Sequence, residues 1–307
     1  MDHAALEVDR HALAARANRR GIVSMIGAMG CFIINDALIK YVSQTLPLAQ
    51  VVFIRSALAS LLVLAVMKAM GEVPRIREST RGWVALRAVL DAIATMLFLL
   101  SLLHLPLATA TAINMASPLF ITALAAFFIG ERIGAPRWLA VGVGFVGVLL
   151  IIQPQADGFD AYAWVCLAAT FLIAVRDLIT RRVNGSIPSI VITFSNTAAV
   201  MLLAGVWSLA EGWRPISGSG IGLLSIAAMF LATAYYLIVG STRDGDLSLI
   251  VPFRYTAILF AAVAGFFIWG DTPNALAWGG MGLLISSGIY VLHTSGRQRA
   301  NAALDRA

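Results

Sequence analysis

Eight ionisable side chains lie within the long apolar runs of this sequence, three of them acidic and five basic. They are Asp36, Lys40, Arg55, Arg87, Asp91, Arg176, Asp177 and Arg254. A charge that is removed from water is costly unless a partner or a cavity compensates for it. Such groups therefore bind a polar solute, pair with one another or close a passage, and the excess of basic side chains indicates a mildly positive interior.

Two pairs of charges have the same spacing and the same order of signs, Asp36 with Lys40 in the first half of the chain and Asp177 with Arg181 in the second. Arg55 is expected at about the depth of Asp36 and joins the first group, and Arg254 is expected near the depth of Asp177 and joins the second. An acidic and a basic residue four positions apart share one face of a helix. We interpret the two groups as gates that close opposite sides of a central site. The alternative is that a duplication preserved pairs that only pack helices.

Between these two layers we expect Asp91, Asn114, Met115, Tyr235 and Tyr236. Together with Phe230, Arg254 and Tyr255, these residues are the side chains expected to bind a substrate. A carboxylate accepts hydrogen bonds from an ammonium group, amide and guanidinium groups donate to a carboxylate, and thioether and rings contact an apolar side chain. Two alternatives stay open: the rings only pack between helices, and Arg87 and Asp91, four residues apart, neutralise each other.

The composition excludes a soluble domain. Hydrophobic residues make up 60% and charged residues 12% of the chain, against about 45–50% and about 25% in soluble proteins. A soluble fold of this size could not bury so much apolar surface, so the chain is predicted to be an integral membrane protein. The net charge of +6 is spread over short loops and both ends, and without a broad basic face no nucleic acid is expected as a partner.

No pattern of enzyme chemistry is found in the sequence. Cys31 and Cys166 lie in apolar runs without a CxxC spacing, and four scattered histidines offer no metal site. The motifs GxxxxGK[ST], HExxH and GxSxG do not occur. The chain is therefore expected to be neither an enzyme nor an ATP-driven pump, and to need no cofactor and no metal.

Ten apolar runs have about the 20 residues that a membrane-spanning helix needs. They are 21–42, 48–69, 80–102, 106–129, 136–153, 162–182, 189–210, 218–240, 247–270 and 275–293. Residues 1–20 and 294–307 remain as tails, and the first tail is predicted to be disordered or to lie at the membrane interface. Spans 5 and 10 are rich in glycine, which favours close packing within one chain or between two copies.

The basic residues are distributed unequally between the two sides of the predicted bundle. With the N-terminus inside, sixteen Lys and Arg residues fall on the cytoplasmic side, and Arg214 alone falls on the other. Loops on the cytoplasmic side of membrane proteins carry an excess of Lys and Arg. Both termini are therefore predicted to be cytoplasmic, in a bacterial-type inner membrane.

The chain also repeats itself. One nearly constant shift along the sequence aligns the first half (21–153) with the second (162–293), so that Asp36 meets Asp177 and Phe120 meets Phe260. Five spans per half is an odd number, so the halves must have opposite orientations in the membrane. Inverted repeats of this kind are typical of transporters that alternate between two access states. The expected fold is an all-α integral membrane protein with ten transmembrane helices in two inverted five-helix repeats.

Several of these features together resemble one known family. They are the five-span repeat, Lys40 late in span 1, Arg55 early in span 2, and the segment TAINMASPLFITALAAFFIGE in span 4. The chain is similar over about residues 21–293 to the EamA branch of the drug/metabolite transporter (DMT) superfamily. Within that branch it resembles the aromatic amino-acid exporters of the YddG type, which implies the same fold and an amino-acid substrate.

The sequence thus predicts a secondary transporter that exports small metabolites, first among them amino acids such as phenylalanine, tryptophan or methionine, by alternating access. The alternative is a carrier of another metabolite, such as a vitamin, a nucleotide derivative or a drug. A membrane enzyme would need clustered carboxylates or histidines at one interface, and a channel fits a single duplicated chain poorly. The expected partners are the substrate and the lipid bilayer, with the chain as a monomer or homodimer.

Overall fold

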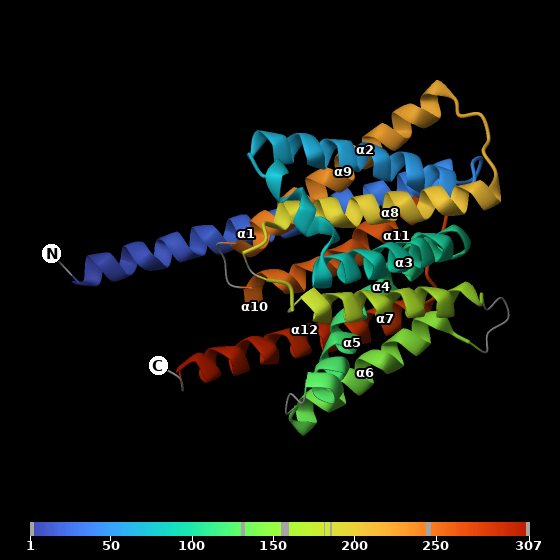
Figure 1. Ribbon diagram of the computed structural model, residues 1–307. Helices are drawn as coiled ribbons and strands as arrows, with labels where there is room; N and C mark the ends of the chain where they lie inside the picture. Colours follow the sequence, from blue (N-terminus) through green and yellow to red (C-terminus); the bar gives the residue numbers. More distant parts are fainter. Residues whose placement is uncertain are drawn as a thin grey trace.

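The computed structural model describes the backbone of residues 3–129, 133–154, 160–180, 182–184, 186–243 and 247–304. Every regular element among these residues is a helix, and ten stretches are long and apolar enough to cross a membrane. Figure 1 shows them side by side in one bundle, with the N-terminal end of α1 and the C-terminal end of α12 at the same end of the molecule. The predicted all-α class with ten membrane-spanning helices is confirmed.

Each half contributes five of the ten spans. The first half contains α1 (His3–Val42), α2 (Leu48–Ala69), the 3₁₀ helix η1 (Val73–Thr80), α3 (Gly82–His104), α4 (Leu107–Asn114), α5 (Ser117–Leu124), the π-helical turn η2 (Ala125–Ile129) and α6 (Ala135–Ile152). The second half contains α7 (Tyr162–Thr180), α8 (Ser189–Glu211), α9 (Gly218–Arg243), α10 (Leu247–Ile250), the 3₁₀ helix η3 (Val251–Tyr255), α11 (Thr256–Trp269) and α12 (Ala275–Leu304).

The observed spans agree with the predicted ones within two residues at eight of the ten positions. The ninth differs because α10 and η3 interrupt it before α11. The first differs because α1 begins at His3, well before the predicted start at residue 21. The expectation of a disordered N-terminal tail is therefore wrong. Its sequence is rich in Ala, Leu and Arg, which are strong helix formers, and contains no Pro or Gly before Gly21.

The packing of the helices follows the internal repeat. Helix α1 of the first half packs along α9 of the second, and the pair that the repeat makes equivalent, α7 of the second half and α3 of the first, packs in the same way. The pair α2 and α8 and the pair α6 and α12 each join equivalent spans of the two halves. A twofold exchange of the halves therefore reproduces the pattern of contacts, as two inverted five-helix repeats require.

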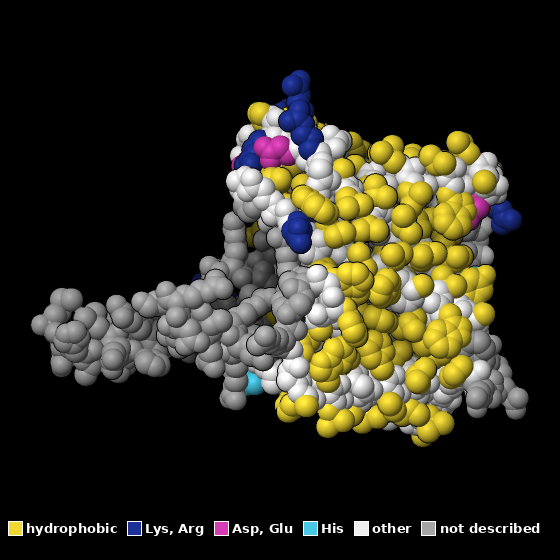
Figure 2. Space-filling view, turned by 60° about the horizontal axis from the view of Figure 1, so that its bottom comes forward, with side chains coloured by type: hydrophobic (Ala, Val, Ile, Leu, Met, Phe, Trp, Pro, Cys, Tyr) yellow, Lys and Arg dark blue, Asp and Glu magenta, His cyan; other side chains and the backbone are white. Residues whose placement is uncertain are grey.

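The outer surface of the bundle suits a lipid environment. Figure 2 shows a face covered largely by apolar side chains, with the charged ones gathered along its margins. Large apolar residues on the outside are strongly exposed, among them Leu209 and Phe267, both 79%. A soluble monomer rarely presents a continuous apolar surface of this kind, so the surface fits the hydrocarbon core of a bilayer.

The glycine-rich spans α6 and α12 pack against each other within the chain. A Cβ atom placed on Gly147 would lie 2.7 Å from the carbonyl oxygen of Gly280, and one on Gly280 would lie 2.6 Å from that of Gly147. Real Cβ atoms do not come so close to a backbone oxygen, so both positions require glycine. Of the two alternatives for these glycines, this pair serves close packing inside one chain.

Candidate substrate cavity

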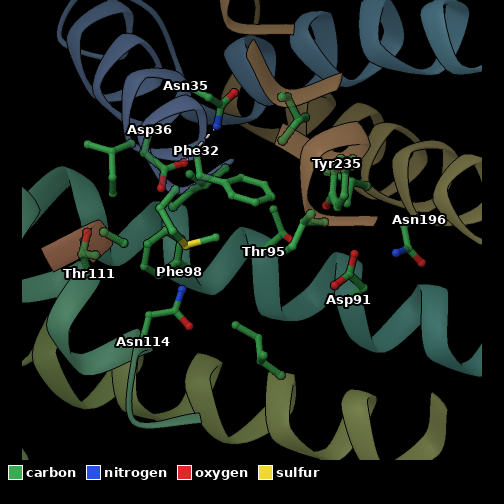
Figure 3. Close-up of a pocket in the computed structure, with 18 of the residues that line it drawn as sticks. Phe32, Asn35, Asp36, Asp91, Thr95, Phe98, Thr111, Asn114, Asn196 and Tyr235 are labelled. Atoms are coloured by element: carbon green, nitrogen blue, oxygen red, sulfur yellow. Dashed lines mark hydrogen bonds between the residues drawn. The ribbon is translucent and has the colours of Figure 1, made fainter. Parts of the chain in front are cut away.

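A cavity of about 270 Å³ lies inside the bundle, between the two halves. Its walls come from α1, α2, α3, α7, α8, α9 and the fourth span of each half. Figure 3 shows polar side chains gathered toward two ends: Asn35, Asp36, Thr111 and Asn114 at one, and Asp91, Asn196 and Tyr235 at the other. The rings of Phe32 and Phe98 lie between them. The cavity thus offers polar groups at both ends and apolar surface between.

The fourth span of each half is interrupted beside the cavity. Helix α4 ends at Asn114 and α5 begins at Ser117, while in the second half η3, which contains Arg254, precedes α11. The shift that relates the two halves brings Asn114 onto Arg254. These two residues therefore occupy equivalent positions, and both line the cavity. Interrupted helices of this kind turn backbone groups and helix ends toward a solute, and they recur at the binding sites of transporters.

Toward the end of the bundle that carries both termini, the charges form a connected network. The guanidinium of Arg176 donates hydrogen bonds to the carboxylate of Asp91 on α3 and, at 2.6 and 2.9 Å, to that of Asp177. Arg87 donates to the hydroxyl of Thr180 at 2.8 Å and to the amide oxygen of Asn196 at 2.7 Å. The network joins α3 to both α7 and α8.

This network corrects one interpretation of the sequence. The spacing of Arg87 and Asp91 allows a self-neutralising pair on one helix. Instead the carboxylate of Asp91 is paired with Arg176 on α7, while Arg87 bonds to neutral oxygens. The reason is that α7 packs along α3, so that Arg176 reaches the carboxylate from the facing helix.

The equivalent charges of the other layer are arranged differently. Asp36 accepts a hydrogen bond of 2.9 Å from the side-chain amide of Asn35, and Arg55 donates to the hydroxyl of Ser56 at 3.2 Å. Lys40 donates to the carbonyl oxygen of Leu105 at 2.5 Å. Among the residues that the structure describes, no ion pair of 4 Å or less involves Asp36, Lys40 or Arg55.

Four polar atoms of the cavity lining are buried without a hydrogen-bond partner. They are Asn35 Oδ1, Arg55 Nε, Thr111 Oγ1 and Arg254 Nε. Buried polar groups in native proteins are nearly always satisfied, by protein or by another molecule. These atoms are therefore the first candidates for contacts with a bound solute.

Two arginines hold the loops together at opposite ends of the bundle. Arg214 donates to the carbonyl oxygen of Thr45 at 3.4 Å, and Arg75 donates to that of Ser186 at 2.7 Å. Thr45 and Ser186 are equivalent in the repeat, since each lies two positions before the proline that precedes a helix. Hydrogen bonds to Glu78 raise the pKa of Arg75, which lies outside the spans. The two contacts form an equivalent pair, which we call the loop latches.

The loop latches were not predicted from the sequence. Arg75 and Arg214 were used there only to assign the orientation of the chain in the membrane. The missed signal was the repeat itself, because nearly the same shift that aligns the two halves brings Arg75 onto Arg214. Gln50 reinforces the second latch: its amide donates to the carbonyl of Arg214 at 2.8 Å and accepts from the backbone N–H of Arg214 at 3.0 Å.

Comparison with known proteins agrees with this geometry. Residues 19–153 match the model of the EamA-like transporter family. The first repeat is EamA-like. The match covers the five spans of the first half, including Asp36, Arg55 and the interrupted fourth span, and supports the family that the sequence resembles.

Three relatives are similar to the chain over nearly its whole length. A riboflavin transporter of Vibrio cholerae is 27% identical, over 89% of this chain and 92% of the relative. The pseudopaline exporter CntI of Pseudomonas aeruginosa is 29% identical, over 90% and 97%. An S-adenosylmethionine uptake transporter of Rickettsia bellii is 25% identical, over 85% and 89%. These relatives carry small metabolites, and none of the three is named for an amino acid, so similarity to the YddG type in particular is not supported.

A solved crystal structure shares the fold. It superposes with a TM-score of 0.62 at 18% sequence identity, over 90% of this chain and 97% of that one. At this identity the likeness shows the fold alone.

The structure brings together five of the eight residues expected at the substrate site. Asp91, Asn114, Met115, Tyr235 and Arg254 line the cavity.

The other three residues of that set lie outside the cavity lining. Tyr236 is 79% exposed on the outer surface, because it neighbours Tyr235 on α9 and therefore points to another face. Tyr255 is buried and lines a separate apolar depression with Pro252, and Phe230 is half-buried on α9. Of the expected gate residues, Arg181 lies outside the described part of the chain.

Several lining residues were not singled out in the sequence. On α3 the side chains of Thr95 and Phe98 follow Asp91 at the i+4 and i+7 positions of one helix face. On α1 the same relation joins Phe32 to Asp36. Helical spacing from the intramembrane aspartates could therefore have predicted Thr95, Phe98 and Phe32 as lining residues. No pattern in the sequence points to Asn196 or Thr111.

Proposed function

We propose that the chain is a secondary carrier that moves a small organic metabolite through the central cavity by alternating access. The observation that supports this most directly is the cavity itself. It lies between two inverted repeats and contains charged and polar atoms that have no partner in the protein. Intramembrane ionisable groups that face a cavity mark the pathway of a solute in many transporters.

The chemistry of the lining favours a substrate with charged or strongly polar groups and a planar or apolar body. Asp36 can accept hydrogen bonds from a cationic or hydroxyl group, and Arg55 and Arg254 can donate to an anionic one. Phe32 and Phe98 provide rings for stacking between the polar ends. Zwitterionic metabolites combine these properties.

Two substrate classes fit this description. The first is aromatic or large apolar amino acids such as phenylalanine, tryptophan and methionine. The second is a larger metabolite, and the similarity to transporters of riboflavin, pseudopaline and S-adenosylmethionine favours it. Since the relatives include exporters and an uptake transporter, net export is a proposal for this chain and does not follow from them.

In the proposed cycle the two charged layers open in turn. Asp36, Lys40 and Arg55 help close the periplasmic side, and Asp177, with Arg181 and Arg254, helps close the cytoplasmic side. The loop latches of Arg214 and Arg75 stabilise the same two closures. The binding of substrate lowers the free energy of the intermediate in which both layers are closed, and release on the far side resets the cycle.

Counterflow in proteoliposomes tests the proposal. Vesicles with purified protein are loaded with an excess of unlabelled riboflavin, S-adenosylmethionine, methionine or phenylalanine, and uptake of the same radiolabelled compound is followed. A carrier gives transient, saturable accumulation for at least one compound, which protein-free vesicles lack. Uptake that is linear in concentration without counterflow would indicate a channel, and no uptake of any of the four would refute the proposed substrate classes.

The same proposal places both termini in the cytoplasm, in agreement with their position at one end of the bundle (Figure 1). A phosphatase fused after Ala307 should be inactive in cells, because it folds only in the periplasm, and a fluorescent protein fused there should be bright. The opposite pattern would invert the assignment of the two gates.

A further inference from the structure

Two arginines of the cavity, Arg55 and Arg254, form no ion pair of 4 Å or less with any residue that the structure describes. Arg55 is 4% exposed, and its Nε has no hydrogen bond. Arg254 lines the cavity with its Nε buried and unpaired, and no ion pair joins it to any residue that the structure describes. A guanidinium group carries its charge at every physiological pH. These two charges therefore remain uncompensated by a salt bridge inside an apolar bundle.

The balance of charges in the lining is positive. Arg55, Arg176 and Arg254 face the cavity together with two carboxylates, those of Asp36 and Asp91. Arg176 forms ion pairs with Asp91 and with Asp177. Outside these ion pairs the lining holds the two guanidinium groups of Arg55 and Arg254 against one carboxylate, that of Asp36. A buried charge without a counter-charge is strongly unfavourable. An anion in the cavity would remove this cost.

Further donors point in the same direction. Arg254 belongs to the 3₁₀ helix η3, which runs directly into α11 (Thr256–Trp269), and it lines the cavity from the second half. The hydroxyl of Thr111, 3% exposed, is also unpaired in the lining. Donors therefore come from several elements of both halves.

We propose that Arg254 forms an anion subsite, which binds a carboxylate or phosphate group of the transported metabolite, and that Arg55 adds a second positive charge to the same cavity lining. This inference deepens the proposed function and rests on it. The cavity then excludes compounds that carry only a positive charge. Asp36, which has no ion pair, is left to accept a cationic or hydroxyl group of the same substrate.

Binding of matched probes to the purified protein in detergent tests the subsite. The probes are 3-phenylpropionate, phenyl phosphate and phenethylamine, which share a phenyl ring and differ in the charged group. The melting temperature of the wild-type protein should rise in a saturable manner with 3-phenylpropionate or phenyl phosphate, and the stronger of the two identifies the preferred anion. It should not rise with phenethylamine. An equal or larger rise with phenethylamine, or no rise with either anion, would overturn the inference.

Variants assign the effect to the proposed residues. Arg254→Gln should weaken binding of the preferred anion at least tenfold, whereas Arg254→Lys, which keeps the charge but loses the planar fork, should weaken it less. Arg19→Gln removes an exposed arginine of α1 outside the cavity and should bind as the wild type does. Unchanged anion binding by Arg254→Gln would overturn the assignment, and so would equal losses in Arg254→Gln and Arg19→Gln. If Arg254→Gln cannot be purified, weaker anion binding by Arg254→Lys, together with the preference of the wild-type protein for the anionic probes, tests the assignment instead.

The outcome is separable from that of the carrier proposal. Counterflow without anion binding would refute the subsite and leave the carrier. Anion binding that is lost in Arg254→Gln, without counterflow of any tested compound, would support the subsite and refute the proposed substrate classes.

Discussion

The two charged layers contain equivalent aspartates, Asp36 and Asp177, yet among the residues that the structure describes only Asp177 has an ion pair. Asp177 is held by the adjacent Arg176, which also binds Asp91 on the facing helix. Its equivalent in the first half, Asp36, is preceded by Asn35, a neutral residue that donates one hydrogen bond. The repeat thus has Arg176 in the second half where the first half has Asn35. Because of this difference, the layer of Asp177 joins α3 to α7, whereas the carboxylate of Asp36 stays available to a solute.

This difference assigns different tasks to the two halves. The Arg176 network stabilises the bundle near the end that carries the termini. Its carboxylates are paired with Arg176 and are therefore less available to a solute. The Asp36 layer contributes less to stability and leaves polar groups free for a solute. The following predictions separate these two roles.

The largest effect on stability is expected for Arg176→Gln. It leaves the carboxylates of Asp91 and Asp177 without their cation inside the bundle, and breaking a buried ion pair from one side costs about 3–5 kcal/mol. The thermal unfolding of the purified variant in detergent measures this loss. A variant as stable as the wild type would contradict the structural role of the network.

The second effect separates activity from stability. Asp36→Asn breaks no ion pair, so the free energy of unfolding should change by less than about 1 kcal/mol. Transport in the counterflow assay should nevertheless fall at least tenfold, because the carboxylate of the cavity is lost. If stability falls as much as in Arg176→Gln, the two layers have the same role and the comparison fails.

A third prediction concerns the direction of opening. Asp36→Asn should favour the state that is open to the periplasm, and Asp177→Asn the state that is open to the cytoplasm, because each weakens one gate. Labelling of a cysteine introduced at Thr95 by a membrane-impermeant thiol reagent, added from either side, reports the change. Shifts in the same direction, or none, would contradict opposed gates.

The smallest effects are expected at the loop latches. Arg214→Gln and Arg75→Gln each remove one hydrogen bond to a loop carbonyl, at opposite ends of the bundle. Each should change labelling of the Thr95 cysteine by about two- to fivefold, and in opposite directions. Equal changes would show that the arginines act on folding and not on a particular closure.

Much of the fold could be predicted because it depends on patterns that are local or repeated. Apolar runs of spanning length predict the positions of the helices. The nearly constant shift between equivalent residues such as Asp36 and Asp177 predicts that the two halves are inverted repeats. The interruption of the ninth span was not evident, since the apolar run continues through Val251 and Pro252.

Side-chain partners were harder to predict than positions. The pairing of Asp91 with Arg176 depends on the contact between α3 and α7, which the spacing of Arg87 and Asp91 on one helix obscured. Tyr235 and Tyr236 differ only in helical phase, and one lines the cavity while the other faces outward. Such choices depend on tertiary packing, which a single sequence does not specify.

Access to the cavity from both sides of the membrane tests the central claim most directly. Asn114→Cys, in a variant with Cys31→Ala and Cys166→Ala, places one thiol in the lining, and Tyr236→Cys in the same variant serves as the control on the outer surface. The impermeant reagent should label Asn114→Cys in right-side-out and in inside-out vesicles, and a transported compound should protect it but not the control. Labelling from one side alone, under every condition and with every compound, would contradict alternating access.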